Sequence, residues 1–88
     1  MAKISDSRLL DALRWIHRYQ ERHGYSPTMR EMVNGLYLSS TSIANYRLLQ
    51  LERIGWIERD RERARAMRIT EKGLAEPGLD SHIRKAHA

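Results

Sequence analysis

The fold is decided by residues 28–55, which read TMREMVNGLYLSSTSIANYRLLQLERIG. Thr28 and Glu31 have the spacing of a capping box, so a helix is expected to begin here and to end near residue 36. Apolar residues recur at helical spacing further on and predict a second helix over residues 41–54. The connection between them is short, and two helices joined by a tight turn are typical of a helix-turn-helix.

An additional helix is predicted before this stretch. An apolar stripe indicates an amphipathic helix over residues 7–23. Asp6 or Ser7 is expected to be its N-cap, because a short polar side chain accepts from the free backbone N–H groups of the first turn. Gly24 stands where a left-handed residue ends many helices.

Beyond the second helix of the central stretch, the apolar period changes from about 3.6 to about 2. Residues 56–59 and 64–70, separated by polar residues, therefore predict a β-hairpin. The expected fold is mainly α with a small β-hairpin, a three-helix winged helix-turn-helix in one domain over residues 1–70. The pattern then fades, so residues 71–88 are expected to form a C-terminal tail of low order.

The composition favours an anionic partner. The 88 residues carry a formal net charge of +5, and thirteen of the sixteen basic residues are arginine. The planar fork of arginine suits phosphate groups and guanine. No apolar run reaches the length of a signal peptide or a membrane span. A cytoplasmic, nucleoid-associated protein is expected.

Other classes of function lack a sequence signal. The chain has no cysteine, which excludes a disulfide, a thiolate metal site and a cysteine nucleophile. The four histidines match no compact set of metal ligands, and no nucleophile elbow or glycine-rich phosphate loop is present. We expect no enzyme activity, no metal, no cofactor and no small-molecule ligand.

Three stretches resemble the N-terminal DNA-binding domain of the LexA repressor family. Residues 23–31 (HGYSPTMRE) resemble its HGYPPTLREI signature, residues 48–55 (LLQLERIG) its LxALERKG run, and residues 64–69 (ARAMRI) its ARAIRL wing strand. The likeness covers residues 7–70 without a gap across the helix-turn-helix. The resemblance implies a winged helix-turn-helix that binds DNA and represses transcription.

The sequence departs from the family pattern in two places. Family members continue into a self-cleaving Ser/Lys peptidase domain that also dimerises, and these 88 residues contain no counterpart of it. Autocleavage is therefore not carried over, and a stand-alone regulator, a phage-type small protein and an excised domain all remain open. Tyr37 stands where the family usually has glycine, so a strained or reshaped turn is expected.

The resemblance implies that five residues face the bases of the major groove: Ser40, Ser42, Ile43, Asn45 and Tyr46. Their chemistry mostly agrees, because asparagine can bond adenine bidentately, serine is an adaptable donor or acceptor, and an apolar side chain can touch a thymine methyl. The alternative is that Ile43 belongs to the core and that Tyr46 packs on the hairpin.

A second set of residues is expected to hold the DNA backbone: Thr28, Arg30, Arg47, Arg63 and Arg65. Thr28 and Arg30 open a helix, and a helix N-terminus suits a phosphate. The hairpin carries five arginines, of which at least two are expected to contact DNA, with Arg63 and Arg65 favoured. Tyr25 and Ser26 lie close by and are further candidate donors to phosphate. The alternative for each arginine is a solvated surface charge.

The predicted function is sequence-specific binding of double-stranded DNA by a transcriptional regulator, expected to be a repressor. One such module contacts one half-site. A palindromic operator is therefore expected, bound by a protein that is a monomer in solution and pairs on DNA. The alternative is a winged-helix protein-interaction module, an anti-repressor or assembly factor, that docks through Tyr46, Leu49 and Ile54. Nonspecific nucleoid binding is a third hypothesis.

Overall fold

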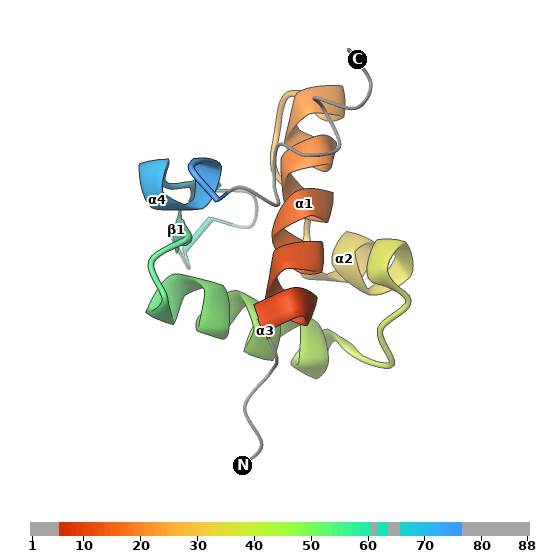
Figure 1. The fold of residues 1–88 in the computed structure, drawn as a ribbon. Coiled ribbons are helices and arrows are strands. Elements are labelled where there is room, and N and C mark those ends of the chain that lie inside the picture. The colour runs from red at the N-terminus through yellow and green to blue at the C-terminus, as the bar shows by residue number, and fades with distance from the viewer. Residues whose placement is uncertain (1–5, 61, 64–65, 77–88) are drawn as a thin grey trace, which may run out of the picture.

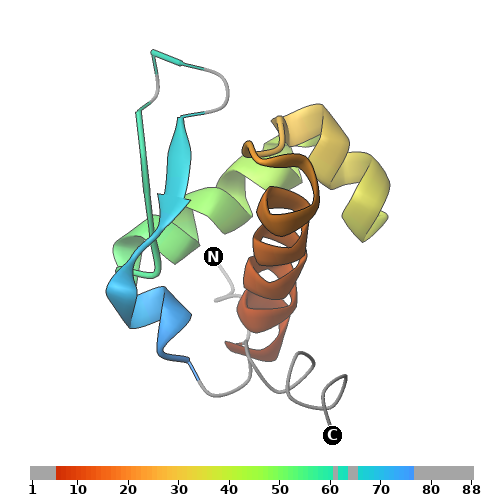
Figure 2. The same cartoon turned by 90° about the horizontal axis from the view of Figure 1, so that it is seen from above.

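A computed structural model describes residues 6–60, 62–63 and 66–76. The elements within these ranges are α1 (Asp6–His23), α2 (Met29–Leu36), α3 (Thr41–Arg53), β1 (Ile57–Arg59), β2 (Met67–Ile69) and α4 (Glu71–Leu74). The three longer helices cross one another, and the hairpin of β1 and β2 stands beside them (Figures 1 and 2). The predicted fold class, mainly α with a small β-hairpin, is confirmed.

The first helix, α1, ends as the sequence predicts but begins earlier. Gly24 has a φ of +79°, a conformation that favours glycine, and its N–H donates to the carbonyl of Gln20 at 2.8 Å. The helix already includes Asp6 and Ser7. The prediction that one of them is the N-cap is therefore wrong, because a capping residue lies outside the helical turn with extended backbone angles.

The start of α2 has the predicted capping box. The backbone N–H of Glu31 donates to Thr28 Oγ1 at 3.2 Å, and the Thr28 N–H donates to Glu31 Oε1 at 2.8 Å. The end of α2 shows the strain that the sequence suggests. Tyr37 adopts the left-handed conformation, with φ 55° and ψ 45°, and its side chain is 93% exposed. A tyrosine in this region costs about 1–2 kcal/mol, and no burial of its ring offsets that cost.

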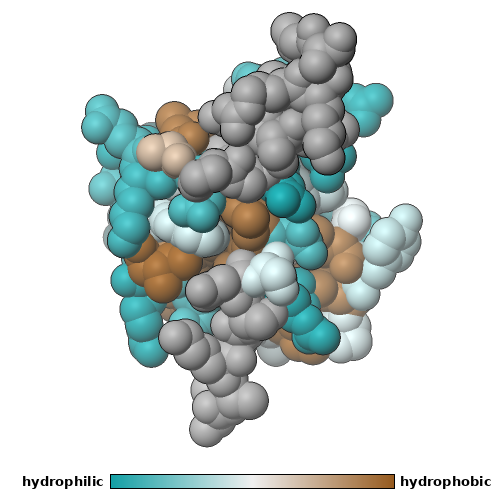
Figure 3. Space-filling view, in the orientation of Figure 1, coloured by the Kyte–Doolittle hydropathy of each residue, from teal (hydrophilic) through white to brown (hydrophobic). Residues whose placement is uncertain are grey.

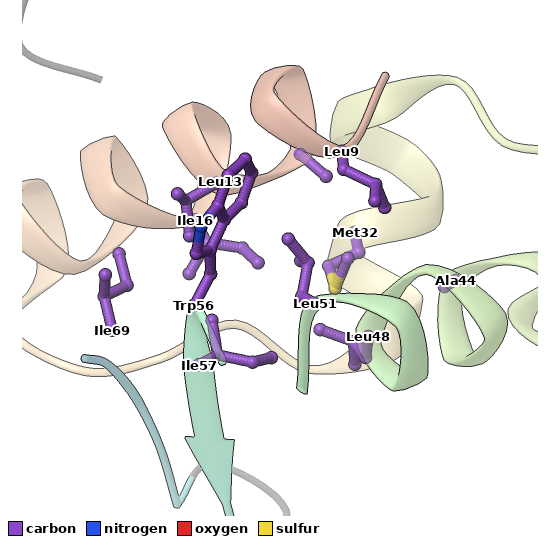
Figure 4. Packing of buried hydrophobic residues seen from close by; sticks show 11 residues of the cluster. Leu9, Leu13, Ile16, Met32, Ala44, Leu48, Leu51, Trp56, Ile57 and Ile69 are labelled. Carbon is purple, nitrogen blue, oxygen red and sulfur yellow. The ribbon is translucent and has the colours of Figure 1, made fainter. Parts of the chain in front are cut away.

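The core lies where α1 crosses α3 and the base of the hairpin (Figure 4). Its members are Leu9, Ala12, Leu13, Ile16, Met32, Ala44, Leu48, Leu51, Trp56, Ile57 and Ile69. Each of the three long helices and both strands contribute to this one cluster. Burial of each large apolar side chain contributes about 1.5–3 kcal/mol, so the cluster fixes how α3 sits against its neighbours.

The hairpin, called the wing below, pairs β1 and β2 in antiparallel register. Ile57 lies opposite Ile69, and both side chains enter the core. Glu58 lies opposite Arg68 on the outer face, where Arg68 Nη2 donates to Glu58 Oε1 at 2.6 Å. The alternation of inward apolar and outward charged residues is the period-2 pattern of a half-buried strand pair.

The wing is followed by a short helix that the sequence does not predict. Residues 71–76 were expected to belong to a tail of low order, but Glu71–Leu74 form α4, capped by Thr70. Gly73 is buried, and a Cβ there would lie 2.5 Å from the backbone carbonyl oxygen of Trp56. This close approach attaches α4 to the base of the wing. Residues 77–88 of the expected tail lie outside the described residues.

A buried hydroxyl joins the wing to the first helix. Ser26 is 4% exposed, and its Oγ donates to the carbonyl oxygen of Met67 at 2.6 Å. Gln20 Nε2 donates to the same carbonyl at 3.1 Å and to Ser26 Oγ at 2.8 Å. The expectation that Ser26 donates to a DNA phosphate is therefore wrong, because its hydroxyl proton is used inside the protein.

Candidate nucleic-acid interface

A groove runs between the start of α2, the first half of α3 and the wing. Its polar lining comes from all three elements and includes Thr28, Arg30, Thr41, Asn45, Arg59 and Arg63. Figure 2 shows the wing and the start of α2 at the same end of the molecule, with α3 passing between them and away. Residues that are far apart in the sequence therefore converge on one concave surface, whose charged members are Arg30, Arg59, Arg63 and Asp60.

The first turn of α3 is exposed on its outer side. Ser40 is the N-cap of α3, and its Oγ accepts from the Ile43 N–H at 3.3 Å. Ser42 and Ile43 are exposed, Ile43 to 37%, so Ile43 is no core residue. Thr41 is also exposed and lines the groove, although the sequence argument gave it no role beyond a possible cap. The turn thus offers three hydroxyl groups and one apolar side chain to a ligand.

The two remaining predicted base-reading residues lie deeper. Asn45 is half-buried and lines the groove, and its Oδ1 accepts from Arg59 Nη2 at 3.0 Å. Tyr46 is half-buried and lines a different hollow of α3, beside Leu49 and Arg53. The structure therefore brings Asn45 to the groove but not Tyr46.

Two arginines stand open on opposite sides of the groove. Arg30 is the second residue of α2, and Arg63 follows β1. Both are exposed, and neither forms an ion pair with any residue that the structure describes. Thr28 caps α2 beside Arg30, where the positive end of the helix dipole adds to the charge. An anion that lies along the groove meets positive charge on both sides.

The other predicted backbone residues are less clearly placed. Arg47 lies on α3 and is half-buried. Its Nε is buried without a hydrogen-bond partner among the described residues. Arg65 lies outside the described residues, as does Arg61. Among the described residues, Arg30 and Arg63 are therefore the exposed, unpaired arginines that line the groove.

The strands of the wing hold their arginines against carboxylates. Arg59 Nε donates to Glu52 Oε1 at 2.9 Å, and the Arg59 side chain is only 12% exposed. Arg68 pairs with Glu58, but here both side chains are more than 60% exposed. Exposed pairs contribute little and are screened by salt. The sequence carries no signal for the Arg59 contacts, because they depend on how a strand packs against a helix.

The surface proposed for protein docking is smaller than the sequence suggests. Ile54 was expected to point outward, but it is partly buried and packs against the core. The reason is that the chain turns at Gly55, where φ is +83°, and leads Trp56 and Ile57 into the core. On the face shown in Figure 3, hydrophobic side chains of the described residues form patches separated by hydrophilic ones. Leu49 remains half-buried on α3.

No three His, Cys, Asp or Glu side chains in the described part of the chain group together in a way that would hold a metal ion. None of the helices described has the length and apolar character required to cross a bilayer.

The described architecture is that of a winged helix-turn-helix domain. α2 and α3 are joined by the tight turn at Tyr37, and the wing follows α3 directly. The chain belongs to the family of LexA DNA-binding domains, whose family model, "LexA DNA binding domain", matches residues 1–66. The resemblance inferred from the sequence is confirmed, and with it the expectation of a DNA-binding domain.

Relatives that match most of this chain include three proteins named LexA repressor. The LexA repressor of Limosilactobacillus reuteri is 39% identical over 74 residues, which cover 84% of this chain and 36% of that protein. That of Enterococcus faecalis is 39% identical over 79 residues, covering 90% and 38%. That of Lactobacillus acidophilus is 40% identical over 77 residues, covering 88% and 37%. The chain thus spans little more than a third of the length of these relatives.

Proposed function

We propose that this chain is a sequence-specific double-stranded DNA-binding transcriptional repressor that acts on the nucleoid in the cytoplasm. The observation that carries the proposal is the groove, in which the exposed first turn of α3 lies between two open arginines, Arg30 and Arg63. A recognition helix reads bases with residues near its N-terminus. Ser40, Ser42 and Ile43 occupy that position in α3. Repression follows if a bound protein excludes polymerase from a promoter.

The backbone contacts fix the position of α3 on the duplex. The N-terminus of α2, with Thr28 and Arg30, faces one phosphate run, and Arg63 on the wing faces another. Arg47 and Arg65 are proposed to add to these contacts. If about six phosphates are contacted in all, the logarithm of the affinity falls with the logarithm of the salt concentration with a slope of about −5.

A single module of this size gives limited affinity. Single DNA-binding modules bury about 600–1,000 Å² of surface. Two copies on an inverted repeat roughly double the contacts and restore affinity near physiological salt. We therefore infer a palindromic operator, bound by a protein that is a monomer in solution and pairs on DNA. A stable dimer in equilibrium sedimentation without DNA would contradict the last point.

Affinity selection from random duplex DNA tests the proposal. The purified chain is used at about 200 mM salt and again at about 50 mM, between which phosphate-dominated binding changes steeply. An enriched inverted repeat at both salt concentrations supports a repressor with base readout. Binding at low salt without an enriched motif contradicts sequence-specific recognition and favours nonspecific nucleoid binding. The selection is repeated with Arg18→Gln, which removes one positive charge from the exposed face of α1. This variant shows how much of the binding depends on net charge alone.

A further inference from the structure

Arg59 is the one described wing arginine that turns back toward α3. It is the last residue of β1, and it donates to two residues of α3 at once. Its Nε reaches Glu52 Oε1 at 2.9 Å, and its Nη2 reaches Asn45 Oδ1 at 3.0 Å. Glu52 and Asn45 are seven residues apart, which places them on the same face of the helix, about two turns from each other.

This contact decides which side of the Asn45 carboxamide faces the wing. A guanidinium group has only donors, whereas a carboxamide has an acceptor oxygen and a donor nitrogen. The Arg59 guanidinium group therefore favours the orientation of the Asn45 carboxamide in which Oδ1, and not Nδ2, faces Arg59. Because the carboxamide is planar, this contact fixes how Nδ2 and the second lone pair of Oδ1 are presented to a ligand in the groove, which Asn45 lines.

We propose that Arg59 is a positioning residue that sets the base preference of Asn45. The inference rests on the proposed DNA-binding function and deepens it. A free asparagine bonds adenine bidentately, since Oδ1 accepts from the adenine amino group while Nδ2 donates to N7. With Oδ1 turned toward Arg59, the carboxamide is held in one orientation, in which Nδ2 donates to an acceptor such as purine N7 and the second lone pair of Oδ1 still accepts.

Burial separates this role from that of a phosphate ligand. The Arg59 side chain is 12% exposed and Glu52, its ion-pair partner, is 22% exposed. To contact a phosphate, Arg59 must break its ion pair with Glu52, which leaves the partly buried Glu52 carboxylate without that partner. Arg68, by contrast, is 68% exposed on the outer face of the same hairpin. Arg68 is therefore the matched control, with the same residue type, the same wing and a carboxylate partner.

The first test needs no DNA. The side-chain amide of Asn45 is followed by nitrogen–proton NMR in the full chain, in Arg59→Lys and in Arg68→Lys. Arg59→Lys keeps the charge but loses the fork that reaches both acceptors. We expect the Asn45 side-chain signals to move in Arg59→Lys and to stay in Arg68→Lys. Unmoved signals in a folded Arg59→Lys variant, with thermal unfolding as the check on folding, would overturn the proposal.

The second test reads base preference by repeating the duplex selection with Arg59→Lys, Asn45→Ala and the double variant. We expect Arg59→Lys to reduce discrimination about tenfold at the base pair where Asn45→Ala reduces it. The double variant is expected to be no worse than Asn45→Ala alone, because the two residues act as one unit. The salt slope of Arg59→Lys should equal that of the unchanged protein.

The outcomes separate the two proposals. If the unchanged protein selects no motif, the proposed function fails and this inference fails with it. If the unchanged protein selects a motif and Arg59→Lys selects it with the same base preferences, only the role of Arg59 is overturned. Equal weakening on all sequences in Arg59→Gln, with a salt slope smaller by about one, also overturns it and makes Arg59 a phosphate ligand.

Discussion

The arginines at the edges of the groove and those on the strands of the wing are held in opposite ways. On the α2 side, Arg30 is exposed and forms no ion pair within the described part of the chain. On the strands of the wing, Arg59 and Arg68 are engaged with Glu52 and Glu58 at 2.9 and 2.6 Å. The same residue type thus offers charge to a ligand at Arg30 and Arg63 and holds protein elements together on the strands of the wing.

The difference shows that the position of carboxylates, and not the number of arginines, decides how much charge the groove presents. The two wing pairs also differ from each other. An exposed pair such as Arg68–Glu58 contributes about 0.2–1 kcal/mol and exchanges its partner easily. Arg59–Glu52 is shielded and includes a further hydrogen bond to Asn45, so its exchange for a phosphate is more costly.

The largest expected effect comes from removing the open charges. Replacing Arg30 and Arg63 together by glutamine should weaken operator binding by more than about a hundredfold, because hydrogen bonds to charged groups contribute about 1.5–3 kcal/mol each. The salt slope should fall by about two. Titration with the selected duplex at several salt concentrations measures both quantities. A loss of the same size in Arg68→Gln would break the comparison, because it would place the wing strands on the DNA.

The wing side depends on close packing at its base, and Gly73→Ala probes it. Alanine is normally the better helix former by about 1 kcal/mol. Here its Cβ would lie 2.5 Å from the Trp56 carbonyl oxygen and 2.8 Å from Ile69 Cγ2. We therefore expect destabilisation by about 2 kcal/mol in urea unfolding, in the range of overpacked cores. A neutral or stabilising result would mean that α4 does not pack on the wing.

Ser26→Ala tests how the wing is joined to the helices. The variant removes the hydroxyl that donates to Met67 O, while Gln20 Nε2 still donates to that carbonyl. Loss of one partly buried hydrogen bond should lower the free energy of unfolding by about 1.5 kcal/mol. The salt slope of DNA binding should not change. A salt slope of DNA binding that is smaller by about one, with unchanged stability, would instead indicate that Ser26 contacts a phosphate.

The parts of the fold that the sequence predicted correctly are those with local causes. The capping box at Thr28 and the left-handed Gly24 act within a few residues, so their spacing in the sequence carries the information. The residues in the exposed first turn of α3 were instead predicted from the family resemblance. The short helix α4 was missed, because its reason to form is the approach of Gly73 to the Trp56 carbonyl across the chain.

The errors at the candidate site have the same origin. Ser26 was assigned to phosphate although its hydroxyl is used by Met67, which is 41 residues away. The contact of Asn45 Oδ1 with Arg59 was likewise missed, because it comes from a strand that the sequence placed only roughly. Side-chain partners between elements depend on packing angles, and the spacing of residues in one chain does not contain those angles.

The smallest expected effect concerns the turn of the helix-turn-helix, and its sign is the informative part. Tyr37 and Gly24 both have positive φ, at 55° and 79°, and each follows the end of a helix. Glycine relieves the clash of Cβ with the backbone, while its greater freedom in the unfolded chain costs about 0.5–1 kcal/mol. Tyr37→Gly is therefore expected to stabilise the domain by about 0.5 kcal/mol, and Gly24→Ala to destabilise it by about 1 kcal/mol.

Thermal and urea unfolding of the two variants measure these opposite shifts, and DNA titration of Tyr37→Gly completes the comparison. The Tyr37 ring is 93% exposed, so its removal takes no packing from the core. If Tyr37→Gly is more stable and binds the operator as before, the strain is an unselected cost of this turn. If it is more stable but binds less well, the exposed ring contributes to the helix-turn-helix side of the interface, since strained residues persist where they serve a site. Destabilisation by Tyr37→Gly would contradict the left-handed conformation itself.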